Sequence, residues 1–194
     1  MASPTEFARA AGNRGLSRPG PRRVAVLGAE STGKSRLAAA LGVRLDGIVV
    51  EEYLREVCHQ AARVPRMEEQ AGIAAEQARR ERLALAAAAE RGLDWVVCDT
   101  TPLMVALYSL DCFDDPGLLP DAIERQRDYT ATLVCMPDIA WVADGIMRMD
   151  PGTRDRIHGR LVGVLDAHGI AWQPVTGSGE ARVRCAMEAL ARTV

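Results

Sequence analysis

Eight consecutive residues near the start of the sequence combine the types and the spacing that bind phosphate groups. Residues 28–35 read Gly-Ala-Glu-Ser-Thr-Gly-Lys-Ser and fit the P-loop pattern Gly-x-x-x-x-Gly-Lys-Ser/Thr. The glycines let the backbone wrap round an anion with its N–H groups pointing inward, at the start of a helix whose dipole favours negative charge. In such a loop Lys34 reaches the β- and γ-phosphates of ATP or GTP, and the Ser35 hydroxyl binds Mg²⁺. The residues expected to bind the nucleotide are Gly28, Glu30, Ser31, Thr32, Gly33, Lys34 and Ser35. Arg36, directly after the run, is left without a role.

Asp99 is the next candidate, because it ends an apolar run at residues 95–98 that is typical of a buried strand. Ligands of open α/β sheets lie at the carboxyl ends of the strands, so a carboxylate there can hold Mg²⁺ near the P-loop. The alternative is a helix N-cap, since Asp99, Thr100 or Thr101 could cap a helix that begins at Pro102. Asp99 is free to bind Mg²⁺ if Thr101 caps the helix instead.

The segment at residues 51–55, Glu-Glu-Tyr-Leu-Arg, follows another predicted strand and suits a phosphate acceptor. A carboxylate at this place can take the proton of a substrate hydroxyl as a general base, and the sequence leaves open whether Glu51 or Glu52 faces the cleft. Tyr53 can stack on a flat ring, and Arg55 can bind a phosphate or a carboxylate through two hydrogen bonds. The alternative is a polar helix start, where acidic residues are favoured by the helix dipole.

Four arginines surround a predicted turn and the start of a predicted helix, where a lid would lie: Arg148, Arg154, Arg156 and Arg160. Lid arginines stabilise the charge of a phosphoryl group during its transfer. The alternative is a solvated helix face, on which Arg156 and Arg160 would be neighbours. We expect one or two of the four to be functional, with Arg148 and Arg154 the leading candidates.

Apolar runs alternate with helical patterns along the chain, which predicts an α/β fold with a parallel five-stranded sheet and helices on both faces. Strands are predicted at 24–27, 48–50, 95–98, 139–142 and around 171–173, the last at an edge or a strand end because it is followed by Pro174. Helices are predicted from Lys34 and over 53–60, 67–91, 102–110, 121–132, 153–167 and 180–191, with a loop over 111–117.

Length and composition fit one globular domain over residues 22–194 behind a disordered leader over residues 1–21. The net charge of −2 gives no reason to expect nucleic acid as a partner, and no apolar run is long enough to cross a membrane. The five cysteines have no metal-binding spacing and are interpreted as reduced thiols of a cytoplasmic protein. The three histidines also lack metal spacing, and the oligomeric state is left open.

These motifs resemble the ribosylnicotinamide kinase domain of NadR-type proteins, whose P-loop has the form Gly-x-Glu-Ser-x-Gly-Lys-Ser. The likeness extends over nearly the whole predicted folded chain through five further motifs. They are Glu-Tyr-Leu-Arg at 52–55, Ile-Ala-Ala-Glu-Gln at 73–77, Cys-Asp-Thr-Thr at 98–101, Asp-Gly-Ile-Met-Arg at 144–148, and Gly177 followed by Arg182.

The resemblance implies a nucleoside-kinase-like P-loop fold with an arginine-bearing lid, within the AAA-like P-loop ATPases and kinases. It implies transfer of the γ-phosphate of ATP to the 5′-hydroxyl of nicotinamide riboside, a step of NAD biosynthesis that uses ATP and Mg²⁺. The catalytic residues would then be Lys34, Glu52, Asp99, Arg148 and Arg154, with Ser35 and Asp99 on the metal. The acceptor would be bound by Glu52, Tyr53, Arg55, Gln77 and Asp99, and Gly177 would lie near the adenine.

Two other hypotheses remain open on the sequence. One is a kinase for another nucleoside, nucleotide or small metabolite. The other is a regulatory module that binds ATP, switches a partner, and hydrolyses ATP slowly or not at all. Residues 51–55 and the lid arginines favour a kinase, since a simple switch needs no groups for a phosphate acceptor.

Overall fold

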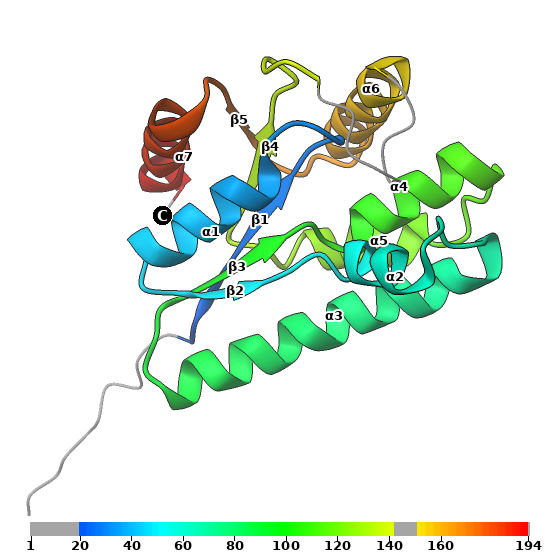
Figure 1. Cartoon of the computed structure of the whole chain (residues 1–194). Coiled ribbons are helices and arrows are strands. Elements are labelled where there is room, and N and C mark those ends of the chain that lie inside the picture. Colours follow the sequence, from blue (N-terminus) through cyan, green and yellow to red (C-terminus); the bar gives the residue numbers. More distant parts are fainter. Residues whose placement is uncertain (1–19, 142–150, 194) are drawn as a thin grey trace, which may run out of the picture.

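Five parallel strands form the centre of the fold in the computed structural model, which describes residues 20–141 and 151–193 (Figure 1). The strand order is β2-β3-β1-β4-β5, so β1, which leads into the P-loop, lies in the middle of the sheet. This confirms the predicted parallel five-stranded sheet. The strands are β1 (Arg22–Leu27), β2 (Ile48–Val50), β3 (Trp95–Asp99), β4 (Ala131–Cys135) and β5 (Gln173–Val175).

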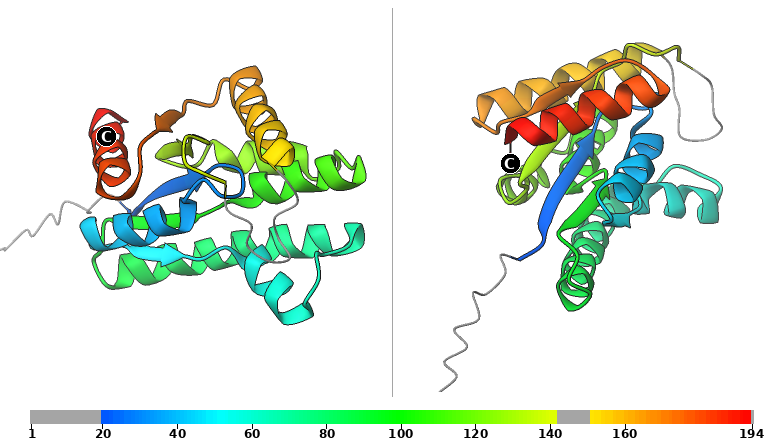
Figure 2. Two further views of the ribbon diagram at one scale, coloured as in Figure 1. Left: turned by 45° about the horizontal axis from the view of Figure 1, so that its top comes forward. Right: turned by 90° about the vertical axis from the view of Figure 1, so that its left-hand side faces the viewer.

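Helices cover both faces of the sheet, as the alternating pattern predicts (Figure 1, Figure 2). On one face α1 packs beside α7, and on the other face α3 packs beside α4, which also contacts α5 and α6. The short α2 packs on α3. The helices are α1 (Lys34–Arg44), α2 (Tyr53–Ala61), α3 (Met67–Glu90), α4 (Pro102–Phe113), α5 (Leu119–Gln126), α6 (Pro151–Ala167) and α7 (Gly179–Thr193).

The central strand β1 is buried on both sides, because its successive side chains enter two different cores. Val24 and Val26 pack with residues of α1 and α7, whereas Ala25 and Leu27 pack with residues of α3, α4, α5 and α6. All four side chains are fully buried. The strand therefore holds the loop that follows it on a rigid base.

The fourth strand lies at a different place from its sequence prediction. A helix over 121–132 and a strand over 139–142 were expected, but α5 ends at Gln126 and β4 is Ala131–Cys135. Residues 139–141 form no strand, so that prediction is wrong. The physical reason is that the apolar run of β4 gains a ladder with β1 and burial of all five residues. Periodicity alone cannot distinguish so short a run from the end of a helix.

Smaller differences concern the ends of elements. Helix α4 continues to Phe113, so the first three residues of the loop predicted at 111–117 are helical. The last strand is Gln173–Val175 rather than 171–173 and includes Pro174. Its place at the edge of the sheet is confirmed, and an edge strand tolerates a residue without a ladder donor. The predicted leader lies outside the described residues, except for its last two.

All five cysteines are free thiols; Cys58, Cys98 and Cys135 are buried, and the last two belong to the two apolar cores. In the described ranges we find no helix with the length and apolarity that a membrane span requires. Cys98 and Cys135 therefore act as small core residues.

Candidate nucleotide and acceptor site

The P-loop connects β1 to α1 with a backbone that favours glycine at two points. Gly28 has φ 143° and Gly33 has φ 78°, both in the region that side chains avoid. A Cβ atom on Gly28 would lie 2.8 Å from the Thr32 hydroxyl oxygen and 2.9 Å from the Cys135 carbonyl oxygen. The loop is thus packed against the end of β4, and Gly28 is fixed by both conformation and space.

Two side chains of the loop bind the same carbonyl group. The Thr32 hydroxyl donates to the Ala29 carbonyl oxygen at 2.7 Å, and the Lys34 ammonium donates to it at 2.9 Å. Lys34 is only 7% exposed, so solvent screens the charge of its ammonium group less than it would at the surface. The structure therefore places a cation where the P-loop pattern expects the phosphates.

Asp99 ends β3 beside the P-loop, where the Ser35 hydroxyl and the Lys34 ammonium lie near enough to its carboxyl group to affect its pKa. Its Oδ1 atom is buried without a hydrogen-bond partner among the described residues. Burial raises the pKa of Asp99, and the nearby Glu52 carboxylate raises it further, whereas the Ser35 hydroxyl and the Lys34 charge lower it. Thr101 caps α4 through a 3.3 Å hydrogen bond from the Leu103 N–H, so Asp99 is not needed as the cap.

Glu52, rather than Glu51, faces the interior at the carboxyl end of β2. The Glu52 side chain is 7% exposed, whereas Glu51 lies on the surface. Arg55 donates to one oxygen of Glu52, Oε2, from Nε at 3.2 Å and from Nη2 at 2.9 Å. These contacts hold Glu52 against Arg55. The Glu52 carboxylate also lies near enough to Asp99 to raise the pKa of its carboxyl group.

Tyr53 and Gln77 are brought together by a backbone contact. The Tyr53 N–H at the start of α2 donates to the Gln77 side-chain oxygen at 2.9 Å, and Gln77 is fully buried. The Arg80 guanidinium lies 4.2 Å from the centre of the Tyr53 ring. Gln77 thus anchors the start of α2 to α3, and the roles predicted for Tyr53 and Gln77 in acceptor binding stay predictions.

A polar contact that the sequence does not predict links the P-loop to α4. The Tyr108 hydroxyl donates to Glu30 Oε2 at 2.8 Å, although the two residues are 78 positions apart. Burial and the neighbouring Glu30 and Glu52 carboxylates raise the pKa of Tyr108 well above its usual value of 10. Tyr108 therefore stays a hydrogen-bond donor at any physiological pH.

Arg182 of α7 ties the P-loop to the loop that contains Gly177. Its guanidinium donates to the carbonyl oxygens of Thr32, Met136 and Gly177 and pairs with the Asp138 carboxylate. Asp138 also accepts a 2.6 Å hydrogen bond from the Gly177 N–H. Arg182 is 4% exposed, so it supports the backbone of the P-loop from the interior of the protein. Gly177 is held near the P-loop by this network.

The arginines predicted for a lid differ in their surroundings. Arg156 and Arg160 of α6 both pair with Asp111, the buried acidic residue near the end of α4, at 2.8 Å and 3.1 Å. This pairing connects α6 to α4, while the Arg156 and Arg160 side chains stay 49% and 41% exposed. Whether they act on a phosphate stays a prediction. The Arg154 side chain is 13% exposed and donates to the Ile139 carbonyl oxygen at 3.0 Å. Arg148 lies outside the described residues.

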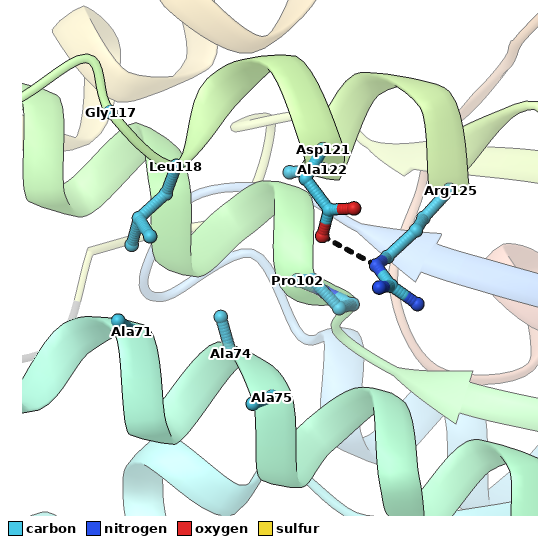
Figure 3. A pocket seen from close by; sticks show the side chains of 9 residues that line it. All are labelled: Ala71, Ala74, Ala75, Pro102, Gly117, Leu118, Asp121, Ala122 and Arg125. Atoms are coloured by element: carbon cyan, nitrogen blue, oxygen red, sulfur yellow. Dashed lines mark hydrogen bonds and ion pairs between the residues drawn. The ribbon is translucent and has the colours of Figure 1, made fainter.

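A cavity of about 130 Å³ lies between α3, α5 and the start of α4, and it contains none of the predicted site residues (Figure 3). Its α3 wall is made of alanines, and Asp121 and Arg125 pair across its opposite side at 2.6 Å. The remaining lining residues are Ala71, Ala74, Ala75, Pro102, Gly117, Leu118 and Ala122. Since its two charged groups already bind each other, we assign it no role.

Comparison with known proteins gives the family. The family model described as an AAA domain matches residues 23–182. The chain belongs to this family. A search of curated proteins finds no significant match. The matched range of the AAA domain includes the whole P-loop, Glu52, Asp99 and Arg182.

Solved structures show that the fold of this AAA domain is shared with nucleoside kinases. A NadR protein in complex with NR superposes with a TM-score of 0.74 at 21% identity, over 89% of this chain and 51% of that chain. A NadR protein in complex with NAD and AMP-PNP superposes with a TM-score of 0.71 at 20% identity, over 89% of this chain and 49% of that chain. A deoxyadenosine kinase from M. mycoides superposes with a TM-score of 0.61 at 10% identity, over 88% of this chain and 99% of that chain. The chain spans about half the length of the NadR structures, whose fold confirms the resemblance drawn from the sequence.

Sequence reasoning found the groups of this AAA domain that lie in motifs and missed the groups that support them. Tyr108 and Asp138 were not singled out, and Arg182 had no assigned role. Their partners lie 78, 39 and 150 positions away, for Tyr108–Glu30, Asp138–Gly177 and Arg182–Thr32. The signal in the sequence was the spacing of Gly177 and Arg182, which the family resemblance singled out without giving Arg182 a role.

Proposed function

We propose that the protein is an ATP-dependent kinase for a small molecule that carries a hydroxyl group. The observation that carries the proposal is the meeting of Lys34, Ser35 and Asp99 at one edge of the sheet. A P-loop lysine, a hydroxyl and a buried carboxylate are what phosphoryl transfer requires on the side of the donor nucleotide. Glu30 and Glu52 add carboxylates that nucleotide binding alone does not need.

Magnesium would be held by Ser35 and Asp99. The orphaned Oδ1 of Asp99 supports this assignment, because a buried carboxylate oxygen without a donor suits a hard cation. In the described residues no three His, Cys, Asp or Glu side chains gather into a metal cluster. In general Mg²⁺ keeps several waters and binds through one or two carboxylates and the phosphates of the nucleotide. Bound Mg²⁺ would neutralise charge on the phosphates.

The acceptor hydroxyl would be bound at the side of Glu52. Glu52 or Asp99 would accept its proton, and both are buried where solvent does not compete for them. Lys34 would stabilise the charge of the transferring group. Arg154 and Arg148 are proposed to complete this stabilisation from the lid, and Gly177 is proposed to lie near the adenine.

The leading acceptor is nicotinamide riboside, phosphorylated at its 5′-hydroxyl. Support comes from the motifs of the sequence and from the fold shared with a NadR protein in complex with NR. The charge of the site agrees, because Glu30, Glu52 and Asp99 are buried carboxylates and the nicotinamide ring of the riboside is cationic. We place the activity in the cytoplasm, where ATP is abundant and free cysteines persist.

A second candidate is a kinase for another nucleoside. The fold shared with a deoxyadenosine kinase from M. mycoides over 99% of that chain favours it. The two candidates differ in the acceptor and agree in the machinery for ATP.

The deciding experiment is ADP release from Mg²⁺-ATP with nicotinamide riboside, adenosine, deoxyadenosine, cytidine or no acceptor, together with identification of the phosphorylated product. We expect strong stimulation by nicotinamide riboside and its loss in Lys34→Ala. Stimulation by another nucleoside alone would support the second candidate. Nucleotide binding without stimulation by any acceptor would contradict a kinase and favour a regulatory module.

A further inference from the structure

The P-loop carries a carboxylate, Glu30, that the phosphate groups of a bound nucleotide would repel. Glu30 is 9% exposed and lies in a loop whose N–H groups and lysine attract anions. A carboxylate can only accept hydrogen bonds, and it repels phosphate. Glu30 therefore needs a partner of another kind.

One of the two carboxylate oxygens of Glu30 has a hydrogen-bond partner within the protein. Glu30 Oε2 accepts from the Tyr108 hydroxyl at 2.8 Å, which turns the carboxylate toward α4. Its second oxygen, Oε1, is buried without a hydrogen-bond partner among the described residues. A buried charge with an unpaired oxygen costs free energy, so the arrangement favours a ligand that donates a hydrogen bond there.

The position of Glu30 favours a contact with the acceptor rather than with ATP. Tyr108 belongs to α4, the helix that follows Asp99, and Glu52 lies near enough to affect the pKa of the Tyr108 hydroxyl. Glu30, Tyr108 and Glu52 thus occupy one region, between the P-loop and the carboxyl ends of β2 and β3. Under the proposed function this is the acceptor side.

We propose that Glu30, positioned by Tyr108, binds a sugar hydroxyl of the acceptor other than the hydroxyl that is phosphorylated. Glu30 is the binding residue, and Tyr108 is a positioning residue that acts through it. The inference rests on the proposed kinase function and deepens it, because it assigns to the P-loop a second task. It predicts a preference for ribonucleosides over acceptors that lack one of the ring hydroxyls.

The test compares a ribonucleoside acceptor with its 2′-deoxy and 3′-deoxy analogues, in the wild-type protein and in Glu30→Ala. The ribonucleoside used is the best acceptor found in the panel above. In the wild type, loss of the bound hydroxyl should lower kcat/KM about 10- to 100-fold, as for a hydrogen bond to a charged group. In Glu30→Ala the same loss should have almost no effect, because the partner is already missing. Glu30→Gln keeps the shape of the side chain and should weaken the preference without abolishing it.

Tyr108→Phe separates positioning from folding. It should raise KM for the acceptor and leave KM for ATP unchanged. Tyr129→Phe is the matched control, since it removes a hydroxyl from another buried Tyr–Glu pair, with Glu81, and should change neither KM. A Glu30→Ala protein that still discriminates against the deoxy analogues as the wild type does, or that binds ATP at least tenfold more weakly, would overturn the inference. A wild-type protein that phosphorylates no acceptor would overturn the proposed function, and this inference with it.

Discussion

At the scale of single residues, the site combines groups that are costly for stability and useful for chemistry. Burial raises the pKa of Asp99 above its ordinary value of 3.8. Between the ordinary and the raised value the native state holds a proton that the unfolded chain has lost, so stability falls as the pH rises through this window. Above this window the native protein carries the ionised Asp99 carboxylate at a cost in stability.

Asp99→Asn should remove this cost and the activity together. We expect the free energy of unfolding in urea at pH 7 to stay equal to that of the wild type or to rise. Acceptor-dependent turnover should fall about 100-fold or more, as for loss of a general base or of a metal ligand. The stabilisation should shrink as the pH falls below 3.8, where Asp99 is protonated in both states. A large loss of stability at pH 7 would contradict this view of Asp99.

Gly28 and Gly33 offer a matched pair for testing the shape of the P-loop. Both have positive φ, but a Cβ on Gly33 would meet its nearest neighbour, the Ile139 Cδ1 atom, at 3.5 Å, whereas Gly28 leaves no room. Gly33→Ala should destabilise the protein by about 1–2 kcal/mol, the cost of a left-handed residue. Gly28→Ala should cost roughly 3 kcal/mol or more, since steric overlap adds to the strain. Urea unfolding measures both, and equal costs would show that backbone conformation alone matters.

At the scale of elements, the sequence predicted strands and helices well where the pattern was local. The end of β1 at Leu27, the P-loop and the start of α4 at Pro102 follow from residues within a few positions of one another. The prediction failed at β4, because this strand is defined by its ladder with β1 about a hundred residues earlier. The choice between Glu51 and Glu52 also needed tertiary structure, since a strand of three residues does not fix which neighbour turns inward.

Arg182 connects three elements, and its removal should affect both stability and nucleotide binding. Arg182→Ala would remove the cation that pairs with Asp138 and the donor to the carbonyl groups of Thr32, Met136 and Gly177. We expect a loss of about 1–3 kcal/mol in urea unfolding, as for acceptors that lose a charged donor, together with weaker ATP binding. Arg182→Lys should recover only part of the lost stability and ATP binding, because one ammonium group cannot reach so many acceptors.

Asp138→Asn provides the control for this network. Asparagine keeps an oxygen for the Gly177 N–H but loses the charge that pairs with Arg182. Its cost should therefore be smaller than that of Arg182→Ala. If Arg182→Ala bound ATP with the affinity of the wild type, the network would support α7 alone and not the shape of the P-loop.

At the scale of the whole molecule, the two cores on either side of one sheet make the P-loop part of the same folding unit as the helices around it. A single domain over residues 22–194 stays our proposal. A ligand bound at the P-loop should then stabilise the entire fold, because it binds the native state and not the unfolded chain.

Mg²⁺-ATP should accordingly raise the melting temperature of the whole protein. At a concentration of about 100 times Kd the stabilisation is about 2.7 kcal/mol, and each kcal/mol raises Tm by roughly 2–4 °C for a chain of this size, so we expect a rise of about 5–10 °C. Lys34→Ala should show little of this rise. Removal of Mg²⁺ with EDTA should reduce it, because the phosphates would lose the cation that Ser35 and Asp99 are proposed to hold. An equal rise with and without EDTA in differential scanning calorimetry would contradict the metal assignment while leaving nucleotide binding intact.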